Sequence, residues 1–218
     1  MTDSPAERWT FGADPLPQTM RAAALLRRVT SLTLALENED DEIEHLIADL
    51  ERSEEVLRHR VPADLVPRVG DSAAGDGRVY VDHAFDVGAY NPCVPEYSVE
   101  VDGDRAQGLV TFPVAYEGPP GFVHGGFLAL FFDCVVQHHN CELGLAGKTT
   151  SLLLTYRRPA PLLADLTFVL QRTVADERIQ TLGALSAGDK VLCQAEVGAI
   201  AGVRANLPEV SPRRAVAR

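Results

Sequence analysis

One segment constrains the fold of this chain more than any other, because residues 124–143 predict a single helix that is apolar on most of its sides. Its apolar side chains are Phe127, Leu128, Leu130, Phe131, Val135 and Val136. A surface helix keeps a polar face, so a helix of this composition is expected to be enclosed by other elements. Its longest apolar stretch, 127–132, is far shorter than the ~20 residues that a membrane span needs. We therefore expect the helix at the centre of a globular domain.

The segments around this helix alternate apolar and polar residues with a period of two, which predicts strands. Before the helix they are 79–81, 97–101 and 109–114, and the last two flank the turn signal Asp102-Gly103. After it they are 149–157, 166–174, 179–186 and 191–200, with a turn at Gly188-Asp189. Runs of strands with one helix predict an α+β fold in which an antiparallel sheet wraps around the central helix.

The 218 residues allow one full domain and an appendage. We expect an N-terminal arm and helical extension at 1–60, a Pro- and Gly-containing linker at 61–78, the main domain at 79–201 and a tail at 202–218. Within the extension, residues 20–60 predict one helix, or two with a break near 38–40. Its apolar seam suits either dimerisation or packing on its own domain, and the sequence leaves both open.

The formal net charge of −11 is concentrated in the extension, since 37–55 contains ten acidic residues and a single base. A nucleic-acid-binding surface is therefore not expected. The four cysteines lie far apart, and residues 1–20 have no apolar leader, which predicts reduced thiols and a cytoplasmic protein. Cysteine and histidine spacings typical of a metal site are missing, so no metal site is predicted.

A glycine-rich turn, 116–126, runs into the start of the apolar helix. The first N–H groups of a helix have no acceptor within it, and the helix dipole favours negative charge there. Gly125 and Gly126 let a ligand approach the backbone closely, because no Cβ intervenes. Such an arrangement is what an oxyanion hole for a carbonyl group requires.

Asp133 lies in the middle of the same apolar helix. A carboxylate there costs several kcal/mol of desolvation unless it is paired or has a function. Eight residues separate it from Gly125, which is roughly 12 Å along a helix axis. One carbonyl carbon cannot contact both groups, so either they have different tasks or the site joins Gly125 of one subunit to Asp133 of another. Two such helices packed antiparallel would bring these two groups together, so we expect a dimeric active site.

These motifs resemble those of the hotdog-fold acyl-CoA thioesterases of the PaaI-like branch, over about residues 79–201. The resemblance rests on the segment Gly121-Phe122-Val123-His124-Gly125-Gly126, on Asp133, on Thr149, and on the strand end Thr155-Tyr156-Arg157-Arg158-Pro159-Ala160-Pro161. It implies a hotdog fold and an enzyme that hydrolyses an acyl-CoA thioester to a carboxylic acid and CoA. CoA enters as part of the substrate, with no cofactor, and a homodimer or homotetramer is expected.

The resemblance also assigns roles to residues. It implies that the N–H of Gly125 polarises the thioester carbonyl and that Asp133 activates water or attacks the carbonyl itself. It implies that Thr149 orients the water, and that His124 supports the glycine turn or bonds near the thioester sulfur. Substrate and CoA contacts are expected from Gly126, Thr155, Arg157 and Arg178. Strand alternation places Thr149 and Thr155 on one face, and Leu152, Leu154 and Tyr156 on the other as core residues.

Two other functions remain open for a chain of this fold. One is an acyl-thioester hydratase or dehydratase, which would use a His and an acid to move a proton on the acyl chain. The other is a non-catalytic module that binds acyl-CoA. The acid in the helix favours hydrolysis, since a pure binder gains nothing from it. After the acid, Gln137 could reach the water or the acyl group, and His138 and His139 could narrow the acyl pocket.

Overall fold

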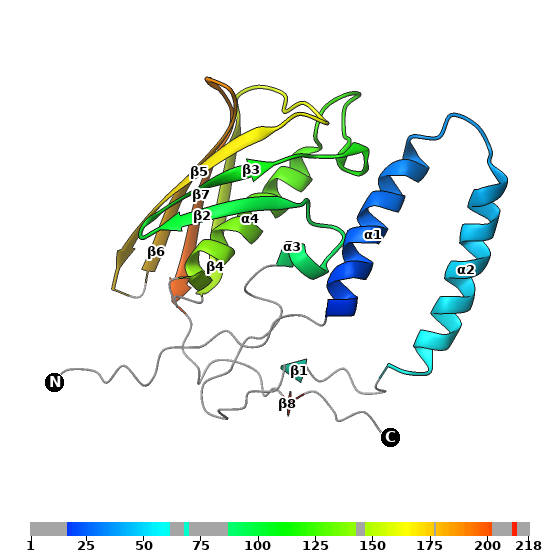
Figure 1. Ribbon diagram of the computed structural model, residues 1–218. Helices are drawn as coiled ribbons and strands as arrows, with labels where there is room; N and C mark the ends of the chain where they lie inside the picture. Colours follow the sequence, from blue (N-terminus) through cyan, green and yellow to red (C-terminus); the bar gives the residue numbers. More distant parts are fainter. Residues whose placement is uncertain are drawn as a thin grey trace.

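The computed structural model describes residues 17–61, 68–69, 87–142, 147–176, 178–201 and 211–212 (Figure 1). Six strands form one antiparallel sheet in the order β2-β3-β5-β6-β7-β4. They are β2 (Tyr97–Asp102), β3 (Arg105–Val110), β4 (Gly147–Tyr156), β5 (Leu166–Ala175), β6 (Arg178–Ala187) and β7 (Lys190–Ala201). Two short strands, β1 (Arg68–Val69) and β8 (Ser211–Pro212), pair separately and in parallel.

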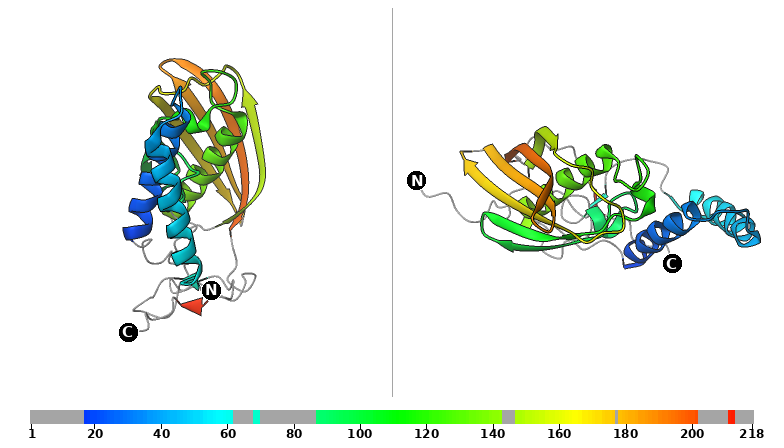
Figure 2. Two further views of the ribbon diagram at one scale, coloured as in Figure 1. Left: turned by 90° about the vertical axis from the view of Figure 1, so that its right-hand side faces the viewer. Right: turned by 90° about the horizontal axis from the view of Figure 1, so that it is seen from above.

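Helix α4 (Gly125–Glu142) lies across one face of this sheet, which curves around it (Figures 1 and 2). The aromatic ring of Phe131 makes edge contacts with the rings of Phe112, Phe132 and Phe168, and all four side chains are buried. Burial of such side chains supplies most of the free energy that holds a helix on a sheet. The predicted α+β hotdog fold with one central helix is confirmed.

The second strand of the first hairpin begins earlier than the sequence predicted. Asp102 pairs with Arg105, and Gly103 has a φ of 56°, so a two-residue turn leads directly into β3. The predicted strand at 109–114 is therefore wrong by four residues at each end, and the short 3-10 helix η2 (Val114–Tyr116) occupies its last part. The alternation was hidden by Gly108, where a Cβ would clash with the Ser98 carbonyl oxygen.

The predicted N-terminal helical extension consists of two helices, α1 (Pro17–Leu34) and α2 (Asp41–Arg58). The predicted break is confirmed, and Asp40 caps α2 by accepting a hydrogen bond from the N–H of Glu42 at 2.9 Å. The two helices form a hairpin beside the domain, and α1 lies nearer to it (Figure 1). A four-residue helix, α3 (Val87–Tyr90), lies against α1.

Arg27 fastens α1 to the domain. Its guanidinium is buried and donates to the carbonyl oxygens of Val94 (2.8 Å), Gly88 (2.7 Å) and Asn91 (3.1 Å), and it pairs with Glu96 at 2.6 Å. A buried guanidinium is stable only when its donors are satisfied in this way. The side of α1 that carries Arg27 therefore belongs to the domain, although it lies outside the segment of the predicted resemblance.

Several predicted segments lie outside the described residues: 1–16, most of the linker at 61–78, the strand at 79–81 and most of the tail at 202–218. The domain boundaries stay predictions. Of the four cysteines, Cys93 is exposed and Cys134, Cys141 and Cys193 are buried. None of the described helices is long and apolar enough to cross a bilayer.

Candidate active site

The turn before α4 is held by its own backbone. The N–H of Gly118 donates to the carbonyl oxygen of Phe122, and the N–H of His124 donates to that of Tyr116, both at 2.9 Å. The ring of His124 then accepts the N–H of Gly126 on Nδ1 at 3.0 Å. Among the described residues the N–H of Gly125 has no acceptor. The first turn of α4 thus leaves one backbone donor open, at Gly125 and not at Gly126.

Tyr116 connects this turn to the helical extension. Its side chain is buried beside Arg27, and burial raises the pKa of Tyr116 to about 12 while the nearby guanidinium opposes that rise. Its carbonyl oxygen is the one that holds the N–H of His124. The buried side of α1 therefore supports the turn that presents Gly125.

Tyr156, at the end of β4, lies directly over Gly125. Its hydroxyl donates to the carbonyl oxygen of Gly125 at 3.0 Å, and a Cβ built on Gly125 would lie 3.0 Å from that hydroxyl oxygen. Burial raises the pKa of Tyr156, so the hydroxyl keeps the proton that it donates. The prediction that Tyr156 is a core residue is wrong: its side chain is 56% exposed, because β4 ends at the rim of the sheet.

Asp133 is oriented by two hydrogen bonds in series. The hydroxyl of Thr149 donates to Oδ1 of Asp133 at 2.7 Å, and Nε2 of Gln137 donates to the Thr149 oxygen at 2.8 Å. Because the amide can only donate, the hydroxyl proton of Thr149 must point to the carboxylate. No other described side chain bonds to this carboxylate, which is half-buried and has Oδ2 free.

Thr149 reaches the helix because β4 contains a bulge. The register with β7 shifts between Thr149 and Ser151, so two residues of β4 oppose one of β7. Beyond the bulge, Leu152 and Leu154 pack against the core under the sheet, and Thr155 lies on the opposite face. The predicted common face of Thr149 and Thr155 is therefore wrong, since strict alternation does not survive an inserted residue.

The structure does not bring the predicted CoA contacts together within one chain. Arg157 follows the end of β4, and its Nε donates to Gln194 at 2.8 Å on the outer side of the sheet. Arg178 begins β6 and is level with Ile200, which pairs with Lys148 at the start of β4. Some eight residue steps separate the two arginines along the strands, roughly 26 Å.

The two histidines after the acid contact the first hairpin. Nδ1 of His138 is 2.9 Å from the hydroxyl of Tyr97, and Nε2 of His139 is 3.0 Å from the carbonyl oxygen of Gly103. Both are buried. Among the described residues, no group of three His, Cys, Asp or Glu side chains could hold a metal ion.

Two residues of this site were not predicted from the sequence. Tyr156 was taken for core, and its contact with Gly125 follows from the place where β4 ends, which period-two alternation does not reveal. Arg27 was missed because its partners are backbone carbonyl groups more than 60 residues away. Gln137 was expected on the face of Asp133, and it contacts Thr149 there.

No protein-family model matches the sequence. Among solved structures, the chain is similar to a thioesterase superfamily protein at 30% identity, with a TM-score of 0.67, over 86% of this chain and 97% of that chain. It is also similar to the E. coli PaaI protein from the phenylacetic acid degradation operon, at 16% identity and a TM-score of 0.45, over 48% of this chain and 82% of that one. A Streptococcus pneumoniae thioesterase protein with coenzyme A gives 17% identity and 0.46, over 48% and 87%. The chain belongs to the thioesterase superfamily.

Proposed function

We propose that the protein hydrolyses an acyl-CoA thioester to a free carboxylic acid and CoA. Membership of the thioesterase superfamily supports the reaction class. The observation that carries the proposal is the carboxylate of Asp133, which interrupts the apolar run of α4 from Phe127 to Val136, with one oxygen held by Thr149 and the other free. A half-buried acid without a basic partner is costly to keep unless chemistry uses it.

In this scheme the N–H of Gly125 donates a hydrogen bond to the thioester carbonyl oxygen and so polarises the carbonyl group. It has no acceptor among the described residues and stands at the N-terminus of an 18-residue helix, where the dipole favours negative charge. A thioester carbonyl that accepts this hydrogen bond becomes more electrophilic, and the oxygen of the tetrahedral intermediate binds more tightly still. Tyr156, by fixing the Gly125 carbonyl, supports the orientation of the adjoining peptide groups.

Asp133 supplies the attacking group in one of two ways. As a general base, it takes a proton from water while the water oxygen bonds to the carbonyl carbon, and the C–S bond then breaks to release the CoA thiolate. As a nucleophile, it forms an acyl anhydride with loss of the thiolate, and water then hydrolyses the anhydride. Both routes need a free carboxylate oxygen. Because Thr149 bonds to Oδ1, Oδ2 is the oxygen that stays available.

Catalysis requires two copies of the chain. Gly125 and Asp133 lie on the same helix, about 12 Å apart along its axis, so one thioester cannot contact both within one copy. The sheet offers a way to bring a second helix close: β4 is an edge strand that contacts α4, and its outer edge has no partner strand among the described residues. Antiparallel pairing of two such edges would set Gly125 of one subunit opposite Asp133 of the other.

The same arrangement would give Arg157 and Arg178 a common task, because a two-fold axis brings opposite ends of the two sheets together. Their guanidinium groups suit phosphate oxygens, so we assign them to the CoA end of the substrate. Thr155, on the outer face of β4, belongs with Arg157 on this side. No cofactor takes part in the scheme, and CoA arrives with the acyl group.

The position of His124 argues against a hydratase. Nδ1 accepts the N–H of Gly126, so in the neutral ring the proton lies on Nε2. A ring held in this way supports the turn and has no free basic nitrogen for removing a proton from an acyl chain. The N–H of Gly126 is used by the same bond, which leaves Gly126 a steric role beside the substrate.

The test is the release of free CoA, followed with a thiol-reactive dye, from short, long and aryl acyl-CoAs. For Asp133→Asn we expect kcat to fall about 10²- to 10⁴-fold, the usual contribution of a positioned base. The matched control is Asp189→Asn, which removes an exposed carboxylate in the β6–β7 turn and should leave kcat unchanged. Binding of acyl-CoA by the wild type without turnover of any substrate would replace hydrolysis by a binding function.

A further inference from the structure

The helical hairpin carries two apolar seams with the spacing of a helix bundle. On α1 and the connection to α2, the seam is formed by Leu25, Val29, Leu32 and Leu36, spaced 4, 3 and 4, with Leu36 two residues beyond the end of α1. On α2 it is formed by Ile43, Ile47, Leu50 and Leu57, spaced 4, 3 and 7. Alternating steps of three and four give the narrow stripe of coiled coils and four-helix bundles, rather than the broad face of a helix lying on a sheet.

These seams are largely uncovered. The residues of α1 that are buried against the domain, Ala23 and Arg27, lie on its opposite side. Leu32 is 69% exposed, Leu50 47% and Leu57 56%, and no residue of α2 is buried. Each leucine left exposed forgoes about 1.5–3 kcal/mol of burial free energy. A continuous apolar stripe of this kind therefore indicates a partner that covers it.

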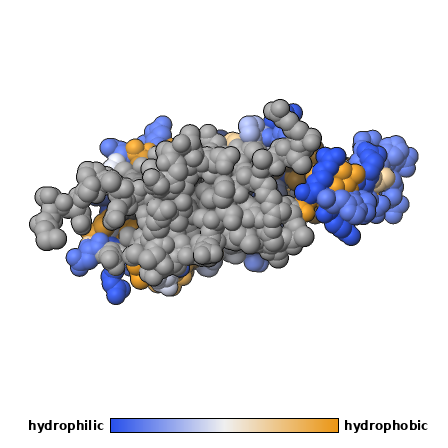
Figure 3. Space-filling view, turned by 90° about the horizontal axis from the view of Figure 1, so that it is seen from below, coloured by the Kyte–Doolittle hydropathy of each residue, from blue (hydrophilic) through white to orange (hydrophobic). Residues whose placement is uncertain are grey.

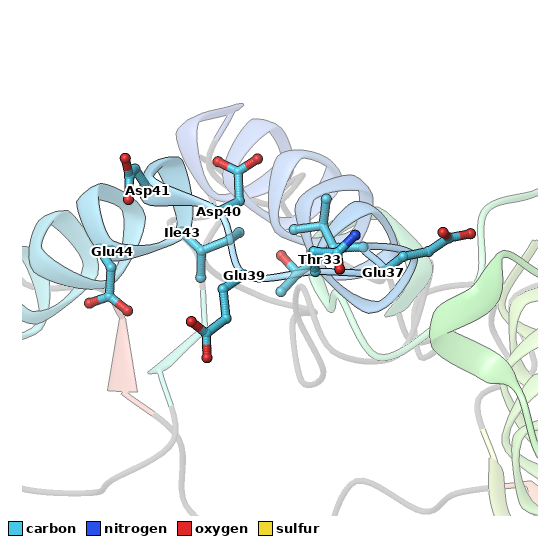
Figure 4. A pocket seen from close by; sticks show the side chains of 9 residues that line it. Thr33, Glu37, Glu39, Asp40, Asp41, Ile43 and Glu44 are labelled. Carbon is cyan, nitrogen blue, oxygen red and sulfur yellow. The ribbon is translucent and has the colours of Figure 1, made fainter.

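The two helices of one hairpin do not cover each other's seams. A hollow lies between them at the turn, lined by Thr33, Leu36 and Ile43 together with the acidic side chains of Glu37, Glu39, Asp40, Asp41 and Glu44 (Figure 4). The space-filling view shows hydrophobic surface between hydrophilic flanks on the hairpin (Figure 3). One hairpin thus supplies two of the four helices that would surround the apolar interior of a four-helix bundle.

Charge indicates what completes it. Helix α1 contains no acidic residue, and its arginines Arg21 and Arg28, one heptad apart, are exposed with no partner among the described residues. Helix α2 carries seven acidic residues against two arginines. The partner best matched to α1 is therefore an acidic amphipathic helix of similar length, and the partner best matched to α2 is a basic one. A second copy of the hairpin supplies both at once.

We propose that the hairpins of two copies of this chain form an antiparallel four-helix bundle, with α1 of each copy beside α2 of the other. This arrangement buries all four seams and sets basic helices against acidic ones, whereas α2 beside α2 would oppose like charges. A two-fold axis generates it with no additional component. The proposal uses neither Asp133 nor Gly125 and so does not depend on the proposed reaction.

The bundle would join different copies from those that β4 pairing joins. Arg27 fastens α1 next to Glu96, which precedes β2, and β2 and β4 are the opposite edges of the sheet. The hairpin and β4 accordingly lie on opposite sides of the domain in the left view of Figure 2. A two-fold axis at the β4 edge therefore leaves the hairpins far apart, and the two interfaces together assemble four chains.

The test is the mass of the full chain by sedimentation velocity, for the wild type and for Leu50→Glu and Leu32→Glu, which place a charge in each seam. Both residues are exposed within one chain, so the variants should fold. We expect their mass to be half that of the wild type. The matched control is Ala48→Glu, which adds the same charge on the other side of α2 and should keep the wild-type mass.

Each outcome bears on one proposal only. Equal masses for the wild type and both seam variants would overturn the bundle, whatever the activity of the protein. If the wild type has twice the mass of the seam variants but releases no CoA, the proposed reaction is overturned and the bundle stands. For Leu50→Glu we expect the CoA release rate per chain to match the wild type, since α4 and β4 are untouched.

Discussion

Helices α1, α2 and α4 each have 18 residues, yet their surroundings differ sharply. Most side chains of α4 are buried or half-buried under the sheet, whereas α2 buries none. Between Phe127 and Val136 the only polar side chain of α4 is Asp133, whereas α2 has polar side chains along its whole length. A carboxylate in this part of α4 therefore needs an explanation, and the one we propose is catalytic. On α2 the apolar residues are the ones that need explaining, and the proposed four-helix bundle would explain them.

The largest contrast is expected in stability. Phe131 of α4 is fully buried among four aromatic rings, so Phe131→Ala should lower the free energy of unfolding by about 3–5 kcal/mol. Leu50→Ala on α2 should change it by less than about 1 kcal/mol, because that side chain is half exposed within one chain. Urea unfolding measured at low protein concentration checks both. Similar losses for the two variants would show that α2 is part of the domain core.

Sequence alone predicted the elements whose pattern is local. The central helix was placed within one residue at each end, because nearly every position from Phe127 to Val136 is apolar. The break that was predicted near 38–40 lies where Asp40 caps α2 in the structure. Strand β3 was misplaced because Gly108 and its polar neighbours hide the alternation, while its pairing with β2 and β5 determines where it lies.

In the candidate site, too, the residues with a local sequence pattern could be predicted, and those positioned by distant contacts could not. Gly125 and Asp133 could be predicted because a glycine turn before an apolar helix and an acid within it are each unusual in sequence. The side of β4 on which Thr149 lies could not be predicted, because the bulge beside it is visible only in the register with β7. Arg27 and Tyr156 act through backbone carbonyls distant in sequence, and no local pattern marks such contacts.

A smaller effect is expected for the hydrogen-bond chain that orients Asp133. Gln137→Glu keeps the length of the side chain and removes its donor, so the hydroxyl of Thr149 can turn from Asp133 to the new carboxylate. We expect kcat to fall about tenfold with KM little changed, which corresponds to one lost hydrogen bond. The measurement is CoA release under saturating acyl-CoA.

The matched control for this variant is Gln107→Glu, an exposed position on β3 that adds the same charge away from α4. It should leave kcat unchanged. A full loss of activity in Gln137→Glu, equal to that of Asp133→Asn, would mean that Gln137 contacts the reacting groups itself. An unchanged kcat would mean that Thr149 orients the carboxylate without help.

The smallest expected effect is on how the free energy of unfolding depends on pH. It again distinguishes α4 from the helical hairpin. His139 is fully buried on α4, with Nε2 beside the Gly103 carbonyl oxygen and no partner for Nδ1 in the described part of the chain. Burial lowers the pKa of His139, and the nearby charge of Arg172 adds to this, against opposing effects of the Gly103 bond and Asp104. By contrast, His45 and His59 of the hairpin are exposed.

Because the folded pKa of His139 lies below its unfolded value of about 6.5, the unfolded chain binds more protons at mildly acidic pH. The contribution of His139 to stability is therefore complete above pH ~6.5 and is lost as the pH falls below that value. We expect the free energy of unfolding to decrease between about pH 7 and 5, and His139→Gln to flatten this dependence. His45→Gln on α2 is the control and should leave the slope as in the wild type. An equal flattening by both variants would contradict the contrast between an enclosed α4 and an exposed hairpin.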